Sequence, residues 1–399
     1  MNDVPILRNW HDDADIRRDL RSWQEEGAAV REVRLPDGPR VWLVTGYEES
    51  RQAFVDPAIV KDYRKAPNPQ GFGRFLHRDE SWAGPNSVIT TDGSHHTRLR
   101  NTLRPFLNRR ALDTLRPVVR TICDETLDAL AEPLDPDLMR DFARVVTARV
   151  VNHILGIDPR HLDTVISTST DYGAGEGSHR ANAAIARLSA IIGETVTARK
   201  RTPDQGIISA LVADPTLTAR DVLGIASTVI IGGTLTTSTL LGWGIAYATT
   251  LDDRHAVMSD PRRREGYIEE MLRRYSPTRI STWRFAAEPT VIGTTPIPAG
   301  AVVCIAPAAA NRDPRQYPDP DLFDPGRPNA ANHLAFGHGA HLCIGAPLAR
   351  LEAATAYSST FTRYPNLRLA LDLEHIPWAS AVVEMHPRTL PIDRNSLFM

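Results

Sequence analysis

The chain has 399 residues, of which 42% are hydrophobic, and a formal net charge of −2 at pH 7. This hydrophobic share excludes a disordered chain, and the near-neutral charge gives no reason to expect nucleic acid as a partner. The sequence has no apolar run long enough for a transmembrane helix and no secretory layout at its start. We therefore expect a cytoplasmic protein that does not bind a membrane.

In chain order, the sequence predicts a β-hairpin followed mainly by helices. Two β-like runs, Ala29–Leu35 and Val41–Val44, flank a Pro-Asp-Gly turn signal at 36–38. A β pattern returns between Thr290 and Ile305, and the stretch 311–332 is rich in Pro and Asp without periodicity. The expected fold is one mainly α domain, residues 1–399, with a small β region. Helical patterns cover Tyr47–Phe54, Ser94–Leu103, Arg110–Ala131, Leu138–Leu155, Ala181–Arg199, Thr218–Thr249, Arg262–Tyr275 and Gly345–Tyr364.

The segment Thr218–Thr249 differs from the other predicted helices in being apolar or small on nearly every face. Thr218 followed by Asp221 has the spacing of a capping box, which marks a helix start. A helix of this length spans about 45 Å. Because a helix that is apolar all round is a buried one, we expect it to cross the core of the protein.

The three cysteines, Cys123, Cys304 and Cys343, are odd in number and widely spaced, which argues against a disulfide framework. We interpret Cys123 and Cys304 as small buried hydrophobes. Cys343 differs because it lies in the glycine-rich segment FGHGAHLCIGAPLAR, residues 336–350, directly before a predicted helix. The dipole and free N–H groups of a helix N-terminus stabilise an anion, so we expect Cys343 to be a thiolate at neutral pH, as a metal ligand must be.

This segment resembles the haem-binding loop of the cytochrome P450 family, Phe-Gly-x-Gly-x-His-x-Cys-x-Gly followed by Leu-Ala-Arg, at every fixed position. The resemblance implies the single-domain cytochrome P450 fold, with haem b (iron protoporphyrin IX) as cofactor and Cys343 as the ligand of its iron. It also implies that Phe336 packs beside the sulfur, that His341 reaches a haem propionate and that Gly345 belongs to the cofactor-binding loop.

A second resemblance to the family lies in the predicted helix Arg262–Tyr275. Glu270 and Arg273 are three residues apart, so both side chains lie on one helix face, and they match the family's Glu-x-x-Arg pair. In the family an Arg from the irregular segment before the Cys loop joins the pair, and Arg327 fits that role. The implied function is structural, because a buried ion network would hold the loop in place. The alternative is a solvated surface pair.

Three further basic side chains match positions that bind haem propionates in the family. His96 and Arg100 lie four residues apart on one helix face, and Arg284 follows seven residues after Pro277. Cationic donors suit a carboxylate, and haem carries two. The alternative for each of the three is an ordinary surface charge.

The stretch GGTLTT, residues 232–237 of the long helix, resembles the family's Ala/Gly-Gly-x-acid-Thr over the distal face of the haem. Gly233 and Thr236 match, and the resemblance implies that they are catalytic residues. Leu235 stands where the family has an acid, and it cannot titrate. Half of the family's proton relay is therefore missing, which leaves the reaction type open.

Substrate contacts follow only from the layout of the family. They would come from the loop 65–91 with Phe72, Phe75 and Trp82, the loop 171–180, residues 230–237, residues 278–283 and a late turn near 380–383. Arg279 would favour an acidic or carbonyl-bearing substrate if it points inward, and facing solvent is the alternative.

The resemblance implies a monooxygenase that oxidises a small organic molecule, which we expect to be a secondary-metabolite intermediate. Because the sequence shows no flavin or iron–sulfur motif, two electrons would come from a separate ferredoxin and ferredoxin reductase. Arg104, Arg109, Arg110 and Arg350 are candidates for their docking face. We expect a monomer. The alternatives are an enzyme of the same fold that performs oxidative coupling, nitration or nitric-oxide reduction, or a non-enzymatic haem carrier or sensor.

Overall fold

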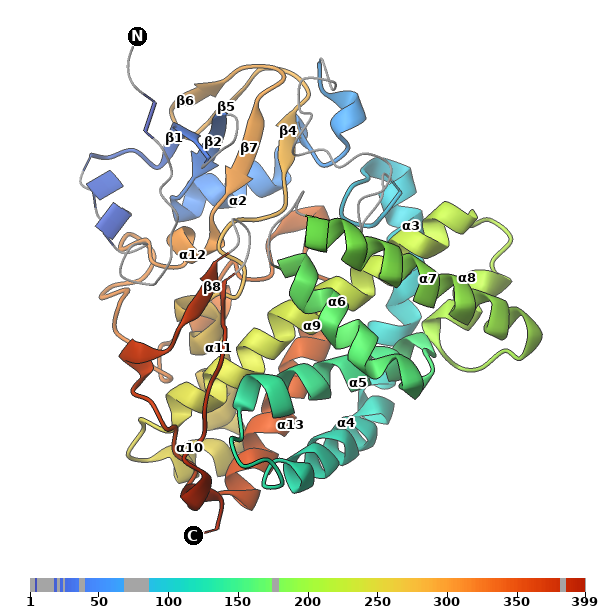
Figure 1. Cartoon of the computed structure of the whole chain (residues 1–399). Coiled ribbons are helices and arrows are strands. Elements are labelled where there is room, and N and C mark those ends of the chain that lie inside the picture. Colours follow the sequence, from blue (N-terminus) through green and yellow to red (C-terminus); the bar gives the residue numbers. More distant parts are fainter. Residues whose placement is uncertain are drawn as a thin grey trace.

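A computed structural model describes residues 4–5, 18–19, 22–23, 26–35, 40–67, 86–173, 179–380 and 385–398. Most of this part of the chain is helical (Figure 1). The helices are α2 (Tyr47–Val55), α3 (Gly93–Leu107), α4 (Arg109–Ala129), α5 (Arg144–Leu155), α6 (Leu162–Gly173), α7 (His179–Arg201), α8 (Ile207–Ala213), α9 (Ala219–Ala248), α10 (Arg254–Ser259), α11 (Pro261–Arg274), α12 (Pro307–Ala310) and α13 (Ala346–Arg363).

The strands form one larger sheet and two small ones. The five-stranded sheet has the order β1-β2-β7-β4-β3, from β1 (Val30–Arg34), β2 (Arg40–Val44), β7 (Val302–Ile305), β4 (Arg284–Ala286) and β3 (Ile59–Val60). Its neighbours are antiparallel except β2 and β7, which pair in parallel with Trp42 opposite Val303. The pairs β5 (Thr290–Ile292) with β6 (Thr295–Ile297), and β8 (Trp378–Ser380) with β9 (Met385–Pro387), make the small sheets.

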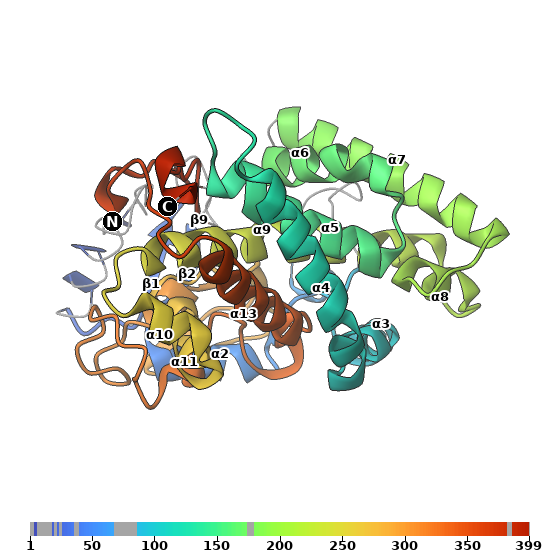
Figure 2. The same cartoon turned by 90° about the horizontal axis from the view of Figure 1, so that it is seen from below.

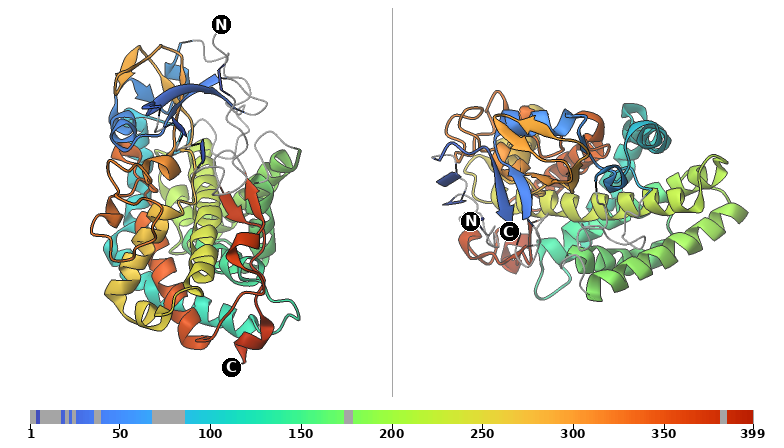
Figure 3. Two further views of the ribbon diagram at one scale, coloured as in Figure 1. Left: turned by 90° about the vertical axis from the view of Figure 1, so that its left-hand side faces the viewer. Right: turned by 90° about the horizontal axis from the view of Figure 1, so that it is seen from above.

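The strands and helices occupy different ends of the molecule. The larger sheet, β5, β6 and α2 gather at the end where the chain begins, and α4, α10 and α13 lie toward the other end (Figure 1). In the view from below, α13 and α4 run close to each other beside α9 (Figure 2). The two further views show α9 passing through the middle of the helical part (Figure 3). The mainly α architecture with a small β region is therefore confirmed.

The helix α9 is the centre of the core, as its apolar composition predicts. Thr218 accepts from the backbone of Asp221 while Asp221 accepts from the backbone of Thr218, so the predicted capping box is present. Among the described residues this helix alone has the length and apolarity to cross a membrane, but 67% of its most apolar window is buried inside the protein. That burial is the expected result for a core helix.

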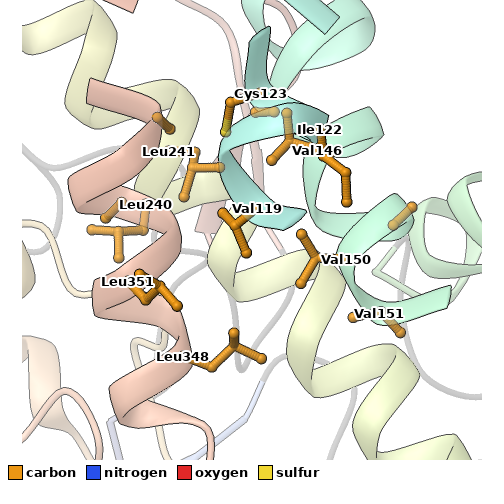
Figure 4. Packing of buried hydrophobic residues seen from close by; sticks show 14 of the residues in the cluster. Val119, Ile122, Cys123, Val146, Val150, Val151, Leu240, Leu241, Leu348 and Leu351 are labelled. Atoms are coloured by element: carbon orange, nitrogen blue, oxygen red, sulfur yellow. The ribbon is translucent and has the colours of Figure 1, made fainter. Parts of the chain in front are cut away.

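Side chains from three helices, α4, α5 and α13, meet those of α9. Figure 4 shows Val146, Val150 and Val151 of α5 together with residues of α4, α9 and α13. Burying a Val or Leu side chain stabilises a fold by about 1.5–3 kcal/mol, so this cluster is a main source of stability. Cys123 belongs to it with no solvent exposure, and Cys304 is equally buried in β7, which confirms both as small core residues.

The local predictions differ from the structure in a few places. The predicted helix Leu138–Leu155 begins with a π-helical segment, Leu138–Ala143, before α5. The helix predicted to end at Leu103 continues as α3 to Leu107 and takes Pro105 into its last turn, although proline disfavours helix at the residue before it. The helices α6, α8, α10 and α12 were not predicted. The turn at 36–38 lies outside the described residues.

Candidate active site

The Cys343 loop has the backbone that its glycines predict. Gly337 and Gly339 have φ values of 73° and 74°, the left-handed region that favours glycine. The backbone N–H of Cys343 donates to the carbonyl of Phe336 at 2.9 Å, which closes the loop. Gly345 has an ordinary φ of −83°, but a Cβ there would lie 3.8 Å from the Cys343 sulfur. The loop therefore holds Cys343 at the start of α13 with little bulk beside it.

The Cys343 side chain is accessible to solvent, although the surrounding protein is close enough to affect its ionisation. Desolvation raises the pKa of the Cys343 thiol and outweighs the backbone N–H groups of Gly345 and Ala346 and the charge of Arg100. The backbone N–H groups at the helix N-terminus and the charge of Arg100 favour the thiolate, as expected for a metal ligand, and desolvation opposes it. A bound metal ion would supply the missing positive charge, because a coordinating thiol loses its proton.

One face of the buried helix α9 is also accessible. Gly232 is exposed, while Gly233 and Thr236 are partly exposed, and a Cβ on Gly232 would meet nothing within 4 Å. The Thr236 hydroxyl donates to the carbonyl of Gly232 at 2.8 Å. Leu235 lies off this face and is only 4% exposed. Gly232 and Thr236 thus form an open strip where a flat group can approach the helix, whereas a Cβ on Gly233 would lie 2.9 Å from Val151 of α5.

The predicted propionate ligands are brought to one region. His96 and Arg284 are each 4% exposed, and Nε2 of His96 and Nε of Arg284 have no hydrogen-bond partner among the described residues. The rings of His96 and His341 lie 4.1 Å apart between centroids. Burial, together with the charges of His341 and Arg100, lowers the pKa of His96 to about 4. Buried donors without partners are costly, so this set fits an anionic ligand such as a haem carboxylate.

Arg100 lies near both His96 and Cys343, because its charge affects the ionisation of each. Asp92, which sequence reasoning missed, lies 3.3 Å from Nε2 of His341 and accepts from the backbone of Lys61 and Asp62. It thereby joins the Cys343 loop to the start of α3. Its place just before Gly93 and the helix was the available signal.

The expected ion network around Glu270 is present and buried. Arg273 donates to both carboxylate oxygens of Glu270 at 2.7 Å, and Arg327 donates to the same carboxylate at 3.3 Å. Arg273 also donates to the carbonyls of Asn311 and Pro320, both at 2.8 Å. The irregular segment 311–332 is therefore anchored to α11, and the surface-pair alternative is wrong.

The expected substrate contacts and docking residues have mixed outcomes. Phe72, Phe75 and Trp82 lie outside the described residues, as do 174–178 and 381–384. Arg279 is 2% exposed and its Nη2 lies 2.7 Å from the sulfur of Met385, so it does not face solvent. Arg350 is not a free docking cation, because its guanidinium is paired with Glu269.

Arg104, Arg109 and Arg110 are exposed, as docking to a partner requires.

Comparisons with known proteins agree with this geometry. The family model described as Cytochrome P450 matches residues 265–366. Cytochrome P450 monooxygenase PikC of Streptomyces venezuelae is 34% identical over 92% of this chain and 88% of its own length. Vitamin D(3) 25-hydroxylase of Pseudonocardia autotrophica is 33% identical over 91% of this chain and 90% of its own. The tirandamycin C-bound P450 monooxygenase TamI matches with a TM-score of 0.86 and 33% identity, covering 97% of this chain and 99% of that structure.

Proposed function

The chain belongs to the cytochrome P450 family and is a haem-thiolate monooxygenase, and on that premise we propose that it oxidises a small secondary-metabolite intermediate. Dioxygen is the oxidant, and two electrons come from a separate ferredoxin and ferredoxin reductase. The observation that carries the proposal is the Cys343 loop, whose accessible sulfur stands before α13. In this proposal all 399 residues form one domain, and the protein is a cytoplasmic monomer.

The names of several relatives support the substrate class. They include 6-deoxyerythronolide B hydroxylase of Saccharopolyspora erythraea and Mycinamicin IV hydroxylase/epoxidase of Micromonospora griseorubida. A solved structure contains tirandamycin C. These names describe the relatives themselves. One of them is a Nocardicin C N-oxygenase, so the relatives differ in the reaction that they catalyse.

The cofactor would be held from two sides. Cys343 would be the iron ligand, with Phe336 and Gly345 beside it, and His96, Arg100, Arg284 and His341 would face the propionates. The unpartnered nitrogens of His96 and Arg284 support this assignment. When bound, the haem supplies the oxygen-activating chemistry, and a thiolate ligand favours cleavage of the O–O bond.

The chain itself would position the substrate and handle protons on the accessible face of α9. Gly232 leaves room for the cofactor, Gly233 lets α5 pack closely against α9, and the hydroxyl of Thr236 is the group on the accessible face that can hold a proton. Leu235 is buried and carries no proton. Proton delivery would therefore run through Thr236 and water, or through a polar group of the substrate.

A second candidate function follows from Leu235. The candidate is an enzyme of this fold that performs oxidative coupling, nitration or nitric-oxide reduction, because Leu235 replaces the acid of the family's oxygen-activating relay. A substrate screen by the shift of the Soret band would find ligands, and turnover of a hit with a ferredoxin system under labelled dioxygen would follow. One labelled oxygen atom in the product supports oxygen insertion, and an oxidised product without label favours the second candidate.

A further inference from the structure

A charged cluster touches the ligand loop from the side of α11. Glu269 of α11 accepts from Nε of Arg350 at 2.6 Å and from Nη2 of Arg350 at 2.8 Å. Nε2 of His333 lies 3.2 Å from the same carboxylate, an ion-pair distance outside good hydrogen-bond geometry. The Glu269 and His333 side chains are buried, and 35% of the Arg350 side chain is exposed. We call Glu269, Arg350 and His333 the Glu269 cluster.

The Glu269 cluster reaches Cys343 through Phe336. The guanidinium carbon of Arg350 lies 4.7 Å from the centroid of the Phe336 ring, a cation–π distance. The His333 ring lies 5.6 Å from the same ring between centroids. The carbonyl of Phe336 accepts the backbone N–H of Cys343. Three successive contacts, with two residues in between, therefore connect the Glu269 carboxylate with the ligand residue.

The pair is charged in the folded protein. Burial favours the neutral form of Glu269, but the hydrogen bonds from Arg350 and the nearby His333 imidazole outweigh it and hold the pKa at about 2. Arg350 carries its positive charge 4.7 Å from the centroid of the Phe336 ring, beside the ligand loop. Glu269 forms a bidentate ion pair with that cation, so the net electrostatic effect on Cys343 depends on both residues.

We propose that Glu269 and Arg350 are positioning residues that set the reduction potential of the haem iron, by fixing Phe336 beside Cys343 and balancing the charge next to the thiolate. The inference rests on the haem-thiolate assignment of Cys343. Outer residues around a metal ligand tune the metal through hydrogen bonds, charge and burial. Here the tuning pair comes from α11 and α13, the two elements that flank the loop.

The charges give the direction of the effect. Reduction makes the iron centre more negative, so an unopposed cation nearby favours the reduced form and an unopposed anion favours the oxidised form. Glu269→Gln leaves Arg350 unopposed and should raise the midpoint potential. Arg350→Gln leaves Glu269 unopposed and should lower it. The double variant should return close to the wild-type value, because both charges are gone.

The test is spectroelectrochemical titration of the haem-loaded variants at pH 8, where Glu269 stays ionised. Arg363→Gln is the matched control, since it removes the same charge from the far end of α13, where Arg363 pairs with the exposed Asp128. Arg350→Lys keeps the charge without the bidentate fork, and its potential should stay closer to the wild type than that of Arg350→Gln.

Opposite shifts in the two single variants, cancelling in the double variant, support the proposal. The proposal is overturned if all variants have the same midpoint potential, or if both single variants shift it in one direction. A pair with a purely structural role would disturb the haem site similarly whichever partner is removed. If Arg350→Gln does not bind haem, the midpoint potential of Glu269→Gln is the test, and a wild-type value in that variant overturns the proposal. A wild type without a thiolate-type carbon monoxide spectrum would instead overturn the haem-thiolate assignment.

Discussion

Arg273 donates hydrogen bonds to both carboxylate oxygens of Glu270 at 2.7 Å, and solvent reaches neither side chain. Removing one partner leaves the other charge buried and uncompensated, at a cost of about 3–5 kcal/mol. We expect Glu270→Ala or Arg273→Ala to melt at a clearly lower temperature and to lose haem. Arg51→Ala is the control, because Arg51 and Glu48 have the same spacing on exposed α2 and such pairs contribute about 0–1 kcal/mol. Wild-type haem content in the α11 variants would contradict the network's role.

Cys343→Ala should abolish the red-shifted Soret band of the reduced, carbon monoxide-bound protein. The band depends on thiolate ligation, and Cys343 is the accessible cysteine of the three. The measurement is a difference spectrum of purified protein with haem content determined separately. Cys304→Ala should keep the band, because Cys304 is buried in β7. If Cys343→Ala kept it, another residue would be the ligand.

Arg284→Met should separate haem binding from the stability of the apoprotein. Arg284 is buried with Nε unpartnered, and burial lowers its pKa to about 10. Replacing a buried charge by an apolar side chain of similar length is often neutral or stabilising, so the apoprotein should melt no lower. Haem should transfer faster to an acceptor such as apomyoglobin, because a propionate partner is lost. An unchanged transfer rate would mean that Arg284 does not face a propionate.

Asp92→Asn should change the acid stability of the protein. Burial disfavours the charged form of Asp92, but hydrogen bonds from His341 and the backbones of Asp62 and Lys61 outweigh it and lower the pKa from 3.8 to about 2. A depressed folded-state pKa contributes stability above the unfolded value, which is lost as pH falls from 3.8 toward 2. The contribution at neutral pH is roughly 2 kcal/mol.

Urea unfolding of the wild type and Asp92→Asn at a series of pH values measures this effect. The variant should be less stable at pH 7, and the gap should narrow as the pH falls below about 4. A gap that does not depend on pH would show that Asp92 acts through shape and not through its charge.

The parts of the fold predicted from sequence are those whose signals are local. The capping box of α9 and the hairpin β1–β2 depend on residues within a few positions of each other. The helix α6 escaped prediction because its segment, LDTVISTSTDYG, is rich in Ser and Thr, whose side chains favour caps and turns over helix interiors. Tertiary packing stabilises it instead, for example through Ser169, which is buried and bonded to Thr234 of α9 at 2.7 Å.

The same limit applies to the site. The Cys343 loop and the Glu270–Arg273 pair could be predicted because each motif is contiguous or nearly so. The pairs Asp92–His341 and Glu269–Arg350 join residues 249 and 81 positions apart, and nothing in the sequence fixes their meeting. Arg350 was therefore assigned to a docking face.

Proton delivery on α9 can be tested through the coupling efficiency, which is the product formed per reduced nicotinamide consumed. Thr236 is the hydroxyl on the accessible face of the helix, so Thr236→Ala should lower this coupling and release more peroxide. Thr237→Ala is a neighbouring control, because Thr237 is buried off that face. Unchanged coupling in Thr236→Ala would favour the oxidative-coupling candidate, or protons supplied by the substrate.

Leu235→Glu should not restore proton delivery, although it places an acid where the family pattern has one. Leu235 is 4% exposed and lies away from the accessible face, so a carboxylate there would be desolvated. Burying an unpaired carboxylate is unfavourable, and the group would take up a proton instead of ionising. We expect lower stability and no gain in coupling. A severalfold rise in coupling would mean that the site is an ordinary acid–alcohol relay that has lost its acid, and that Thr236 still occupies the working position.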